Sequence, residues 1–227
     1  MSLLQQRVAI VTGAGTGIGR ETALQLAAEG ALVILVGRRK EKLEEVARLI
    51  EQRGGRSLVC PADVTNSEEV QNLKQLVLSQ VDRVDILVNN AGGTGPYSLI
   101  HDMSYETWDH IIQLNLYSVF LMTNAFLPVM RSQQYGRIVG VTSSLATSNF
   151  ESLGAYSAAK AGMEAFIRAV ALEEGKYGIL ANLFDPGNLK TEQNPYGQGD
   201  PSTVIHKLVP LTCLSSDGPT GQTVRAY

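Results

Sequence analysis

Short apolar runs alternate with longer amphipathic stretches along most of the chain, and this alternation constrains the fold most strongly. The runs are rich in Val, Ile and Leu and are apolar at successive positions, as strands buried on both faces of a parallel sheet must be. They occupy residues 7–12, 31–36, 57–60, 85–90, 136–142 and 179–184. Helices are predicted between them, near residues 17–29, 40–53, 67–80, 104–131 and 153–175. The order predicts an α/β fold with a doubly wound, mostly parallel sheet and helices on both faces.

Residues that favour helix ends support several of these boundaries. Thr65 and Asn66 precede the helical "SEEV" turn and can accept hydrogen bonds from its free N–H groups. Gly30 and Gly54 stand just beyond two predicted helices, where the backbone commonly turns left-handed. We find no internal repeat and no linker, so residues 1–227 are predicted to form a single domain.

Charge and composition exclude several classes of partner. The formal net charge of −3 offers no basic field for nucleic acid or anionic lipid, which favours a small-molecule partner. No segment approaches the roughly 20 apolar residues of a membrane helix. Cys60 and Cys213 fit no metal or redox spacing, which indicates a reduced cytoplasmic setting. His101, His110 and His206 are scattered without ligand spacing, so no metal site is expected.

A glycine-rich turn joins the first predicted strand to the first helix. The segment "TGAGTGIGR" has the pattern T-G-x-x-x-G-x-G on Thr12, Gly13, Gly17 and Gly19. Glycines in this place let the backbone approach a pyrophosphate, and the helix N-terminus supplies free N–H groups and a favourable dipole. The turn therefore predicts dinucleotide binding on a Rossmann unit, although a purely structural turn is the alternative.

The end of the second strand bears on which nicotinamide nucleotide is bound. A carboxylate there would bond the ribose 2′-hydroxyl of NAD, whereas arginine accommodates the 2′-phosphate of NADP. The chain has Arg38 and Arg39 directly after Gly37, and no carboxylate. NADP(H) is favoured, against the alternative that these arginines are only the solvated start of a charged helix.

A tyrosine and a lysine in "YSAAK" have the spacing of one helix face. Tyr156 and Lys160 are four residues apart, which places an ammonium beside a phenol. A nearby positive charge favours the phenolate, so the phenol could exchange a proton with a carbonyl or alcohol oxygen near neutral pH. The pair alone is a weak signal, because a surface tyrosine often stands near a surface lysine.

Together with these features, further motifs make the chain resemble the short-chain dehydrogenase/reductase family over about residues 6–191. They are "ADV" from Ala62 to Val64, "NNAG" from Asn89 to Gly92, Asn115, a Ser–Tyr–Lys set, and "PGNLKT" from Pro186 to Thr191. The resemblance implies a Rossmann domain that binds a nicotinamide nucleotide and acts on small molecules. Each motif is weak by itself, but their order and spacing are specific.

The resemblance also implies roles for individual residues. Tyr156 would be the general acid/base, and Lys160 would lower its pKa and bind the nicotinamide ribose. Ser143 would hydrogen-bond the substrate oxygen, since it precedes Tyr156 by the family's 13 residues, whereas Ser144 would be a loop residue. Asn115 would hold a water of a proton relay, or alternatively only bend its helix. The cofactor would be bound by Gly13, Thr16, Gly17, Ile18, Gly19, Arg38, Arg39, Asp63, Val64, Asn90, Ala91, Gly92, Tyr156, Lys160, Pro186, Gly187 and Thr191.

The function that the resemblance implies is NADP(H)-dependent interconversion of a carbonyl and a secondary alcohol. A nucleotide-binding relative with little or no turnover, acting as a sensor or scaffold, is the alternative from another class. A methyltransferase on a similar fold would leave the Ser–Tyr–Lys spacing unexplained. The family also implies a homodimer or homotetramer through the helices near 104–131 and 153–175, although Leu116, Phe120, Phe166 and Val170 could equally pack on their own sheet.

The resemblance weakens at two places. Asp185 stands before the Pro-Gly pair, where the family has a small residue, so the charge of the local pocket is in doubt. After Thr191 the segment "VIHKLVPL" (204–211) passes almost directly to "TCLSSDGPTGQTVRAY". We therefore expect residues 192–227 to be a shortened substrate-loop and C-terminal region that lacks a covering helix and leaves the substrate cleft open.

Overall fold

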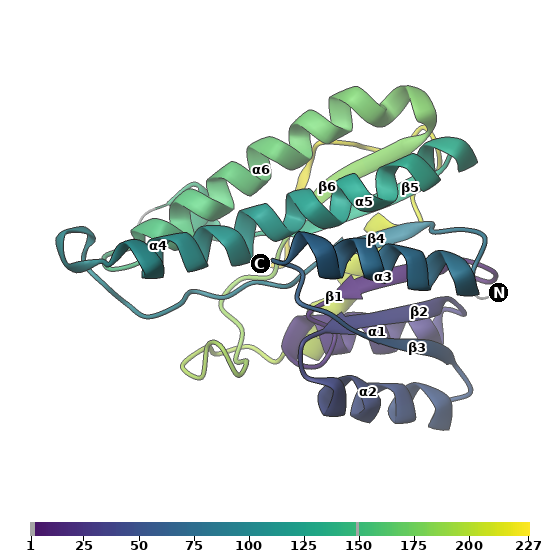
Figure 1. The fold of residues 1–227 in the computed structure, drawn as a ribbon, viewed down its shortest axis with the longest axis horizontal. Helices are drawn as coiled ribbons and strands as arrows, with labels where there is room; N and C mark the ends of the chain where they lie inside the picture. Colours follow the sequence, from purple (N-terminus) through teal and green to yellow (C-terminus); the bar gives the residue numbers. More distant parts are fainter. Residues whose placement is uncertain (1–2, 149) are drawn as a thin grey trace.

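A parallel sheet of seven strands runs through the computed structural model, which describes residues 3–148 and 150–227 (Figure 1). The strands are β1 (Val8–Thr12), β2 (Leu32–Gly37), β3 (Arg56–Pro61), β4 (Ile86–Asn89), β5 (Gly136–Val141), β6 (Ile179–Asp185) and β7 (Thr223–Arg225). Their order across the sheet is β3-β2-β1-β4-β5-β6-β7, and every pairing is parallel. The predicted fold class is confirmed, and the carboxyl ends of all strands lie at one edge.

Helices cover both faces of the sheet. The α-helices are α1 (Gly17–Ala28), α2 (Lys40–Gln52), α3 (Ser67–Gln80), α4 (Tyr105–Ile112), α5 (Ser118–Gln133), α6 (Gly154–Glu174) and α7 (Ile205–Leu208). Short 3-10 turns occupy Ile100–Asp102, Ser144–Ala146, Gly175–Tyr177, Pro201–Thr203 and Val209–Thr212. Helices α3, α5 and α6 pack on one face, and α1, α2 and α7 on the other.

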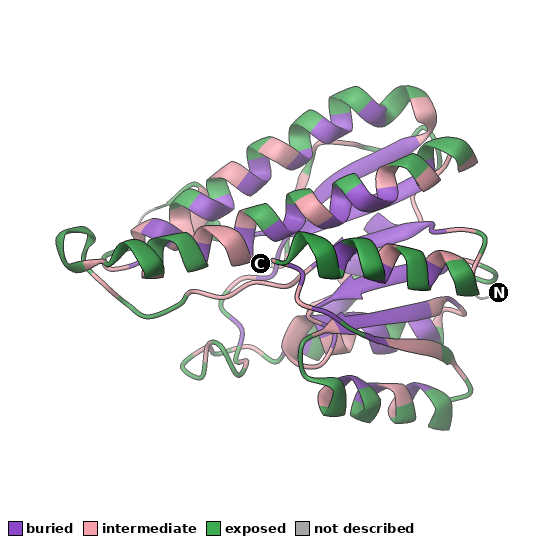
Figure 2. Ribbon diagram, in the orientation of Figure 1, coloured by how far each residue is buried: buried purple, intermediate pink, exposed green. Residues whose placement is uncertain are grey.

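The strands are apolar at successive positions because each strand serves two cores. On β1, Ile10 belongs to the core under α3, α5 and α6, whereas Ala9 and Val11 belong to the core under α1, α2 and α7. Figure 2 shows the central strands buried throughout and the outer faces of the helices exposed. A residue pattern of this kind is what a sheet covered on both sides requires.

The expected helix ends at three positions are confirmed. The Asn66 side chain accepts hydrogen bonds from the N–H groups of Glu68 and Glu69 at the start of α3. Gly30 and Gly54, just beyond α1 and α2, have φ values of 95° and 75°, in the left-handed region. The two glycines end their helices, because a left-handed backbone would strain any residue that has a Cβ.

The long helix predicted near 104–131 is divided by a π-helical turn. Gln113–Tyr117 forms this turn between α4 and α5. The whole segment Tyr105–Gln133 has a mean hydropathy of 1.3 over its most apolar window and is long enough to cross a membrane, contrary to our expectation from the sequence. Half of that window is buried inside the protein, as in the core helices of α/β domains, so its apolar character serves the packing on the sheet.

The expectation that no helix would cover the sheet after Thr191 is wrong. Helical turns fill Pro201–Thr212, and their Ile205 and Leu208 side chains are buried against the core under α1. Pro201 opens this segment and Pro210 interrupts it, so the chain forms short turns and not one long helix. The segment Pro201–Thr212, just before the stretch judged too short for a helix, therefore supplies the cover, and β7 then completes the sheet.

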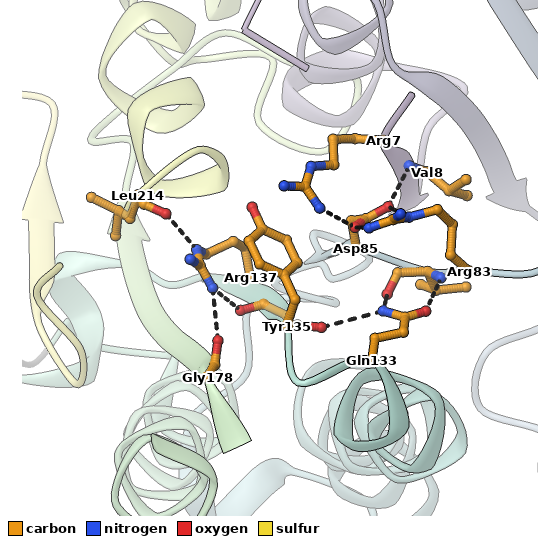
Figure 3. A network of polar contacts seen from close by, with 11 residues as sticks. Arg7, Val8, Arg83, Asp85, Gln133, Tyr135, Arg137, Gly178 and Leu214 are labelled. Carbon is orange, nitrogen blue, oxygen red and sulfur yellow. Dashed lines mark hydrogen bonds and ion pairs between the residues drawn. The ribbon is translucent and has the colours of Figure 1, made fainter. Parts of the chain in front are cut away.

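A charged network ties the amino ends of the strands together, at the edge opposite the carboxyl ends (Figure 3). Asp85 is fully buried before β4 and accepts hydrogen bonds from Arg7 Nη1 at 2.7 Å, Arg83 Nε at 2.8 Å and the Val8 N–H at 2.9 Å. Burial raises the pKa of this carboxyl, but the hydrogen bonds outweigh burial and hold the pKa below its ordinary value. The network joins β1 to β4.

Arg137 extends this network to β5 and β6. It is 1% exposed and donates to the carbonyl oxygens of Gly136, Gly178 and Leu214 at 2.7–2.9 Å. Its guanidinium lies 4.1 Å from the centre of the Tyr135 ring, and Arg7 lies 4.0 Å from the same ring (Figure 3). Burial lowers the pKa of Arg137, because it removes water from the charged guanidinium. The three carbonyl dipoles and the face of the Tyr135 ring replace that hydration.

We expect Asp85→Asn to destabilise the fold and to flatten its acid sensitivity. The folded-state pKa of Asp85 lies below its unfolded value, so its contribution is present above the unfolded pKa of about 3.9 and is lost as pH falls through the folded pKa. Loss of the charged hydrogen bonds costs on the order of 2 kcal/mol at neutral pH. Urea unfolding at pH 7 and pH 3 measures both effects, with Asp82→Asn as control. Equal losses at the two pH values would contradict the prediction.

Candidate active site

A cavity of about 700 Å³ opens at the carboxyl ends of the strands. It lies beside β1, where the order of the strands reverses: β2 is on one side of β1 and β4 is on the other. The connections that leave β1 and β4 run in opposite directions across the sheet, and a crevice forms between them. Its walls come from the glycine-rich turn after β1, the ends of β2 and β3, the loop after β4, the end of β5, helix α6 and the loop after β6. The sheet thus brings together the segments that carry the predicted motifs.

Nineteen predicted site residues can be compared with this lining, and seventeen of them line the cavity. Those that line the cavity are Gly13, Thr16, Gly17, Ile18, Arg38, Arg39, Asp63, Val64, Asn90, Ala91, Gly92, Ser143, Tyr156, Lys160, Pro186, Gly187 and Thr191. Gly19 and Asn115 lie outside this lining, and their roles in the site stay predictions. A Cβ at Gly19 would lie 2.3 Å from the Gly13 carbonyl oxygen, so this glycine permits close packing of α1 under the turn.

The glycine-rich turn can receive an anionic group. Gly13 and Gly17 have φ values of 64° and 54°, a conformation that favours glycine. Helix α1 begins at Gly17, has no acidic residue in its first turn, and its Thr16 hydroxyl caps no N–H group among the described residues. The first N–H groups of α1 are therefore available to a ligand in the cavity, as a pyrophosphate requires.

Thr12 and Asn90 hold this turn against the loop after β4. The Thr12 hydroxyl oxygen accepts the N–H groups of Asn90 and Ala91, both at 2.9 Å, and donates to the Val88 carbonyl at 3.3 Å. The Asn90 side chain donates to the Thr12 carbonyl at 2.8 Å. Two loops that are 78 residues apart are thereby fixed relative to one another.

Both arginines after β2 lie near carboxylates. Arg38 Nη1 is 4.0 Å from Asp63 Oδ2, and Arg39 Nη2 is 2.6 Å from Glu192 Oε2. The first contact links the ends of β2 and β3, whereas the second reaches a loop on the far side of the cavity. The arginines thus line the cavity as predicted, but each already has an acidic neighbour.

Ser143, Tyr156 and Lys160 meet at the inner end of the cavity. Ser143 follows β5, and Tyr156 and Lys160 lie in the first two turns of α6, which packs along β5 and β6. Lys160 is 4% exposed, donates from Nζ to the Val141 carbonyl at 2.8 Å, and lies 5.7 Å from the centre of the Tyr156 ring. The family resemblance predicted this trio, and the fold brings its three side chains together.

The expected lowering of the Tyr156 pKa by Lys160 is not found in this arrangement. Burial raises the pKa of Tyr156 to about 12, hydrogen bonding to Ser143 partly offsets this, and the negative charge of Asp185 adds to the increase. Burial also lowers the pKa of Lys160 to about 8. The ammonium is directed at the Val141 carbonyl, so its charge is not placed on the phenol oxygen.

Asn115 lies behind the cavity wall, within the π-helical turn. Its side chain donates to the carbonyls of Gly93 and Ile111 at 2.8 and 2.9 Å and accepts the Gly93 N–H at 3.0 Å. A Cβ at Gly92 would lie 2.7 Å from Asn115 Oδ1 and 3.3 Å from Lys160 Nζ. The amide therefore distorts its helix and supports the loop in front of Lys160, whereas its role in a proton relay stays a prediction.

Asp185, the residue that departs from the family pattern, is buried beside the trio. It is 2% exposed, accepts the Gly187 N–H at 3.0 Å and the Tyr227 hydroxyl at 2.8 Å, and so ties the end of β6 to the segment after β7. Asp185 does not line the cavity. Its negative charge nevertheless affects the site, because it raises the pKa of Tyr156.

Several lining residues had no signal in the sequence. They are Lys42, Leu43, Leu145, Phe150, Leu153, Glu192, Gln193, Asn194 and Tyr196. Most belong to loops that pack on the cavity only in the folded chain, and the polar stretch after Thr191 gave no indication that it folds back. Among the described residues, no group of three or more His, Cys, Asp or Glu is placed to hold a metal ion.

Comparison with known proteins agrees with this geometry. The short chain dehydrogenase family model matches residues 7–198. The chain belongs to this family of oxidoreductases. A curated relative, the 3-oxoacyl-[acyl-carrier-protein] reductase of Synechocystis, is 36% identical over 226 residues, which are 99% of this chain and 90% of the relative.

Solved structures of family members superpose closely. A short chain dehydrogenase from Shigella flexneri, in complex with NADP, has a TM-score of 0.92 and 31% identity over 99% of this chain and 98% of the other. Levodione reductase has a TM-score of 0.92 and 27% identity, over 98% and 96% of the two chains. The overall arrangement of the sheet and helices is therefore that of the family.

Proposed function

We propose that this protein is an NADP(H)-dependent oxidoreductase that interconverts a carbonyl and a secondary alcohol. The observation that carries the proposal is the meeting of Ser143, Tyr156 and Lys160 at the inner end of a cavity whose outer end is the glycine-rich turn. The turn and the N-terminus of α1 suit a pyrophosphate, and Gly92 leaves room beside Lys160. The residues present thus fit a nicotinamide dinucleotide, whose nicotinamide ribose Lys160 would bind.

The proposed chemistry divides between the cofactor and the chain. The bound nicotinamide supplies or accepts the hydride. Tyr156 Oη donates a proton to the carbonyl oxygen in reduction and takes one from the alcohol in oxidation. The Ser143 hydroxyl hydrogen-bonds that oxygen and fixes its position against the phenol. Lys160, held by the Val141 carbonyl, binds the nicotinamide ribose and supports proton exchange.

The preference for NADP(H) is supported by Arg38 and Arg39 at the end of β2, since a guanidinium fork suits a phosphate. The Shigella flexneri relative is solved with NADP. The Synechocystis relative is a 3-oxoacyl-[acyl-carrier-protein] reductase, which makes a carbonyl compound the class of substrate to test first. The fold and the composition favour a cytoplasmic enzyme.

A nucleotide-binding protein without turnover is the second candidate. The observation in its favour is the pKa of Tyr156, about 12, which leaves almost no phenolate at neutral pH. A protonated phenol is nevertheless the form that reduction requires. Oxidation of NADPH by a panel of ketones and 3-oxoacyl thioesters separates the candidates, because a sensor would bind NADPH without consuming it.

We expect Tyr156→Phe to reduce kcat for carbonyl reduction by at least about a hundredfold, since general acid catalysis contributes that much. The substitution removes one hydroxyl and little volume, so the Kd for NADPH should change less than twofold. Tyr97→Phe is the matched control, because Tyr97 lines the same cavity and is 62% exposed. Near wild-type turnover in Tyr156→Phe would remove this residue from the mechanism.

The two directions of the reaction should depend differently on pH. Oxidation needs the phenolate, and the pKa of Tyr156 is about 12, so kcat/KM for an alcohol should rise about tenfold per unit between about pH 5 and pH 7, below the Lys160 pKa of about 8. Reduction needs the phenol and should stay level over the same range. Initial rates in both directions test this, and an alcohol-oxidation rate that is independent of pH would contradict the assignment.

We propose that the chain forms a homodimer or homotetramer through α5 and α6. Phe120 is 41% exposed, and its ring lies 5.9 Å from Tyr117 and 6.1 Å from Phe166, which gives an aromatic patch across the two helices. Val170, by contrast, packs in the protein's own core.

Light scattering at micromolar concentration should give a mass of two or four 24.5 kDa chains. Phe120→Glu should shift this mass toward one chain, because it places a charge in the proposed interface. Leu76→Glu, at a 47% exposed position of α3, is the matched control. A wild-type chain that is monomeric would contradict the proposal.

A further inference from the structure

The loop after β6 folds back across the mouth of the cavity. Three consecutive residues touch three different walls. A Cβ added at Gly17 would lie 3.2 Å from Thr191 Cγ2, Glu192 pairs with Arg39 at 2.6 Å, and a Cβ added at Gly93 would lie 3.0 Å from Gln193 Oε1. All six residues line the cavity.

Hydrogen bonds within the loop fix the position of Glu192. Thr191 and Asn194 exchange backbone hydrogen bonds at 3.1 and 3.2 Å, so Glu192 sits in a closed turn. Leu189, 6% exposed, anchors the loop and pairs with Gly199 through an isolated bridge. The carboxylate is therefore presented toward the end of β2 by a structured segment.

Other cations at this end of the cavity are paired locally. Lys42 Nζ is 3.0 Å from Glu45 on the same helix, and Arg38 is near Asp63 on the adjacent strand end. Only the pair of Arg39 with Glu192, among the described ion pairs at this end, joins two segments 153 residues apart across the cavity. Both side chains are about half exposed, at 52% and 50%.

We propose that Glu192 is a determinant of cofactor selectivity: its carboxylate competes with the 2′-phosphate of NADP(H) for Arg39. The inference rests on the proposed binding of a nicotinamide dinucleotide in this cavity. A 2′-phosphate bound to Arg39 must either displace Glu192 or lie close to its negative charge, and both oppose binding. NAD(H) has a neutral hydroxyl in that position and leaves the ion pair intact.

The size of the effect follows from the exposure of the pair. Exposed ion pairs contribute little because water and salt screen them, and their usual strength corresponds to a factor of about two to five in affinity. Removing the Glu192 charge should therefore strengthen NADPH binding by about two- to fivefold. The affinity for NADH should stay within the error of the measurement.

A different role for Glu192 makes a different prediction. If the carboxylate only holds the loop closed, its loss would alter NADPH and NADH binding by the same factor, because both carry the pyrophosphate and nicotinamide that the loop covers. The ratio of the two affinities is therefore the informative quantity. It is unaffected by a general loosening of the loop.

Calorimetric titration of the full chain with NADPH and NADH provides the test, on wild type, Glu192→Gln, Arg39→Ala and the double variant. Glu173→Gln controls for loss of a surface carboxylate, since Glu173 is exposed on α6. We expect the NADPH/NADH affinity ratio to rise about two- to fivefold in Glu192→Gln, to stay unchanged in the control, and to lose its response to Glu192→Gln when Arg39 is absent.

Equal changes for both nucleotides, or a response that persists without Arg39, would overturn the role of Glu192 and leave the proposed function intact. A wild-type chain that binds neither nucleotide would overturn the proposed function and this inference together. A chain that prefers NADH, but whose ratio responds to Glu192→Gln as described, would support the role of Glu192 and contradict only the proposed NADP(H) preference.

Discussion

The position of β1 between β2 and β4 is the constraint on which the rest of the site depends. The strand order reverses there, so the glycine-rich turn and the loop after β4 face one another across a crevice. The bonds of Thr12 with Asn90 and Ala91 then fix their separation. The positions of the other site residues are set relative to these two loops. They include the arginines after β2 and the Ser143, Tyr156 and Lys160 trio after β5 and in α6.

Burial decides how the proposed catalytic groups behave. Lys160 gains a neutral partner, the Val141 carbonyl, and the phenol of Tyr156 is kept protonated by its surroundings. The chain thus places a proton donor, and not a ready base, at the inner end of the cavity. Asp185, which lies outside the cavity lining, raises the pKa of Tyr156 further through its negative charge. The residue that departs from the family pattern therefore helps to keep the phenol protonated.

Much of this architecture could be predicted from the sequence, because strands apolar at successive positions and glycines with defined roles are local signals. The helical turns around Leu208 could not, since their two prolines argue against a helix and only burial on the sheet favours one. The pairing of Arg39 with Glu192 joins segments too distant for any spacing rule. The direction of the Lys160 ammonium is likewise a matter of packing.

The π-helical turn at Gln113–Tyr117 has a consequence for how the chain can vary in length. Such a turn holds one residue more than an α-helical turn, and each residue of an α-helix rotates the next by about 100°. Deleting a single residue here would swing α4 around α5 and carry Asn115 away from Gly93. Insertions and deletions are therefore tolerable in the flanking loops, whereas the number of residues between Tyr105 and Gln133 is fixed by the geometry of the wall behind Lys160.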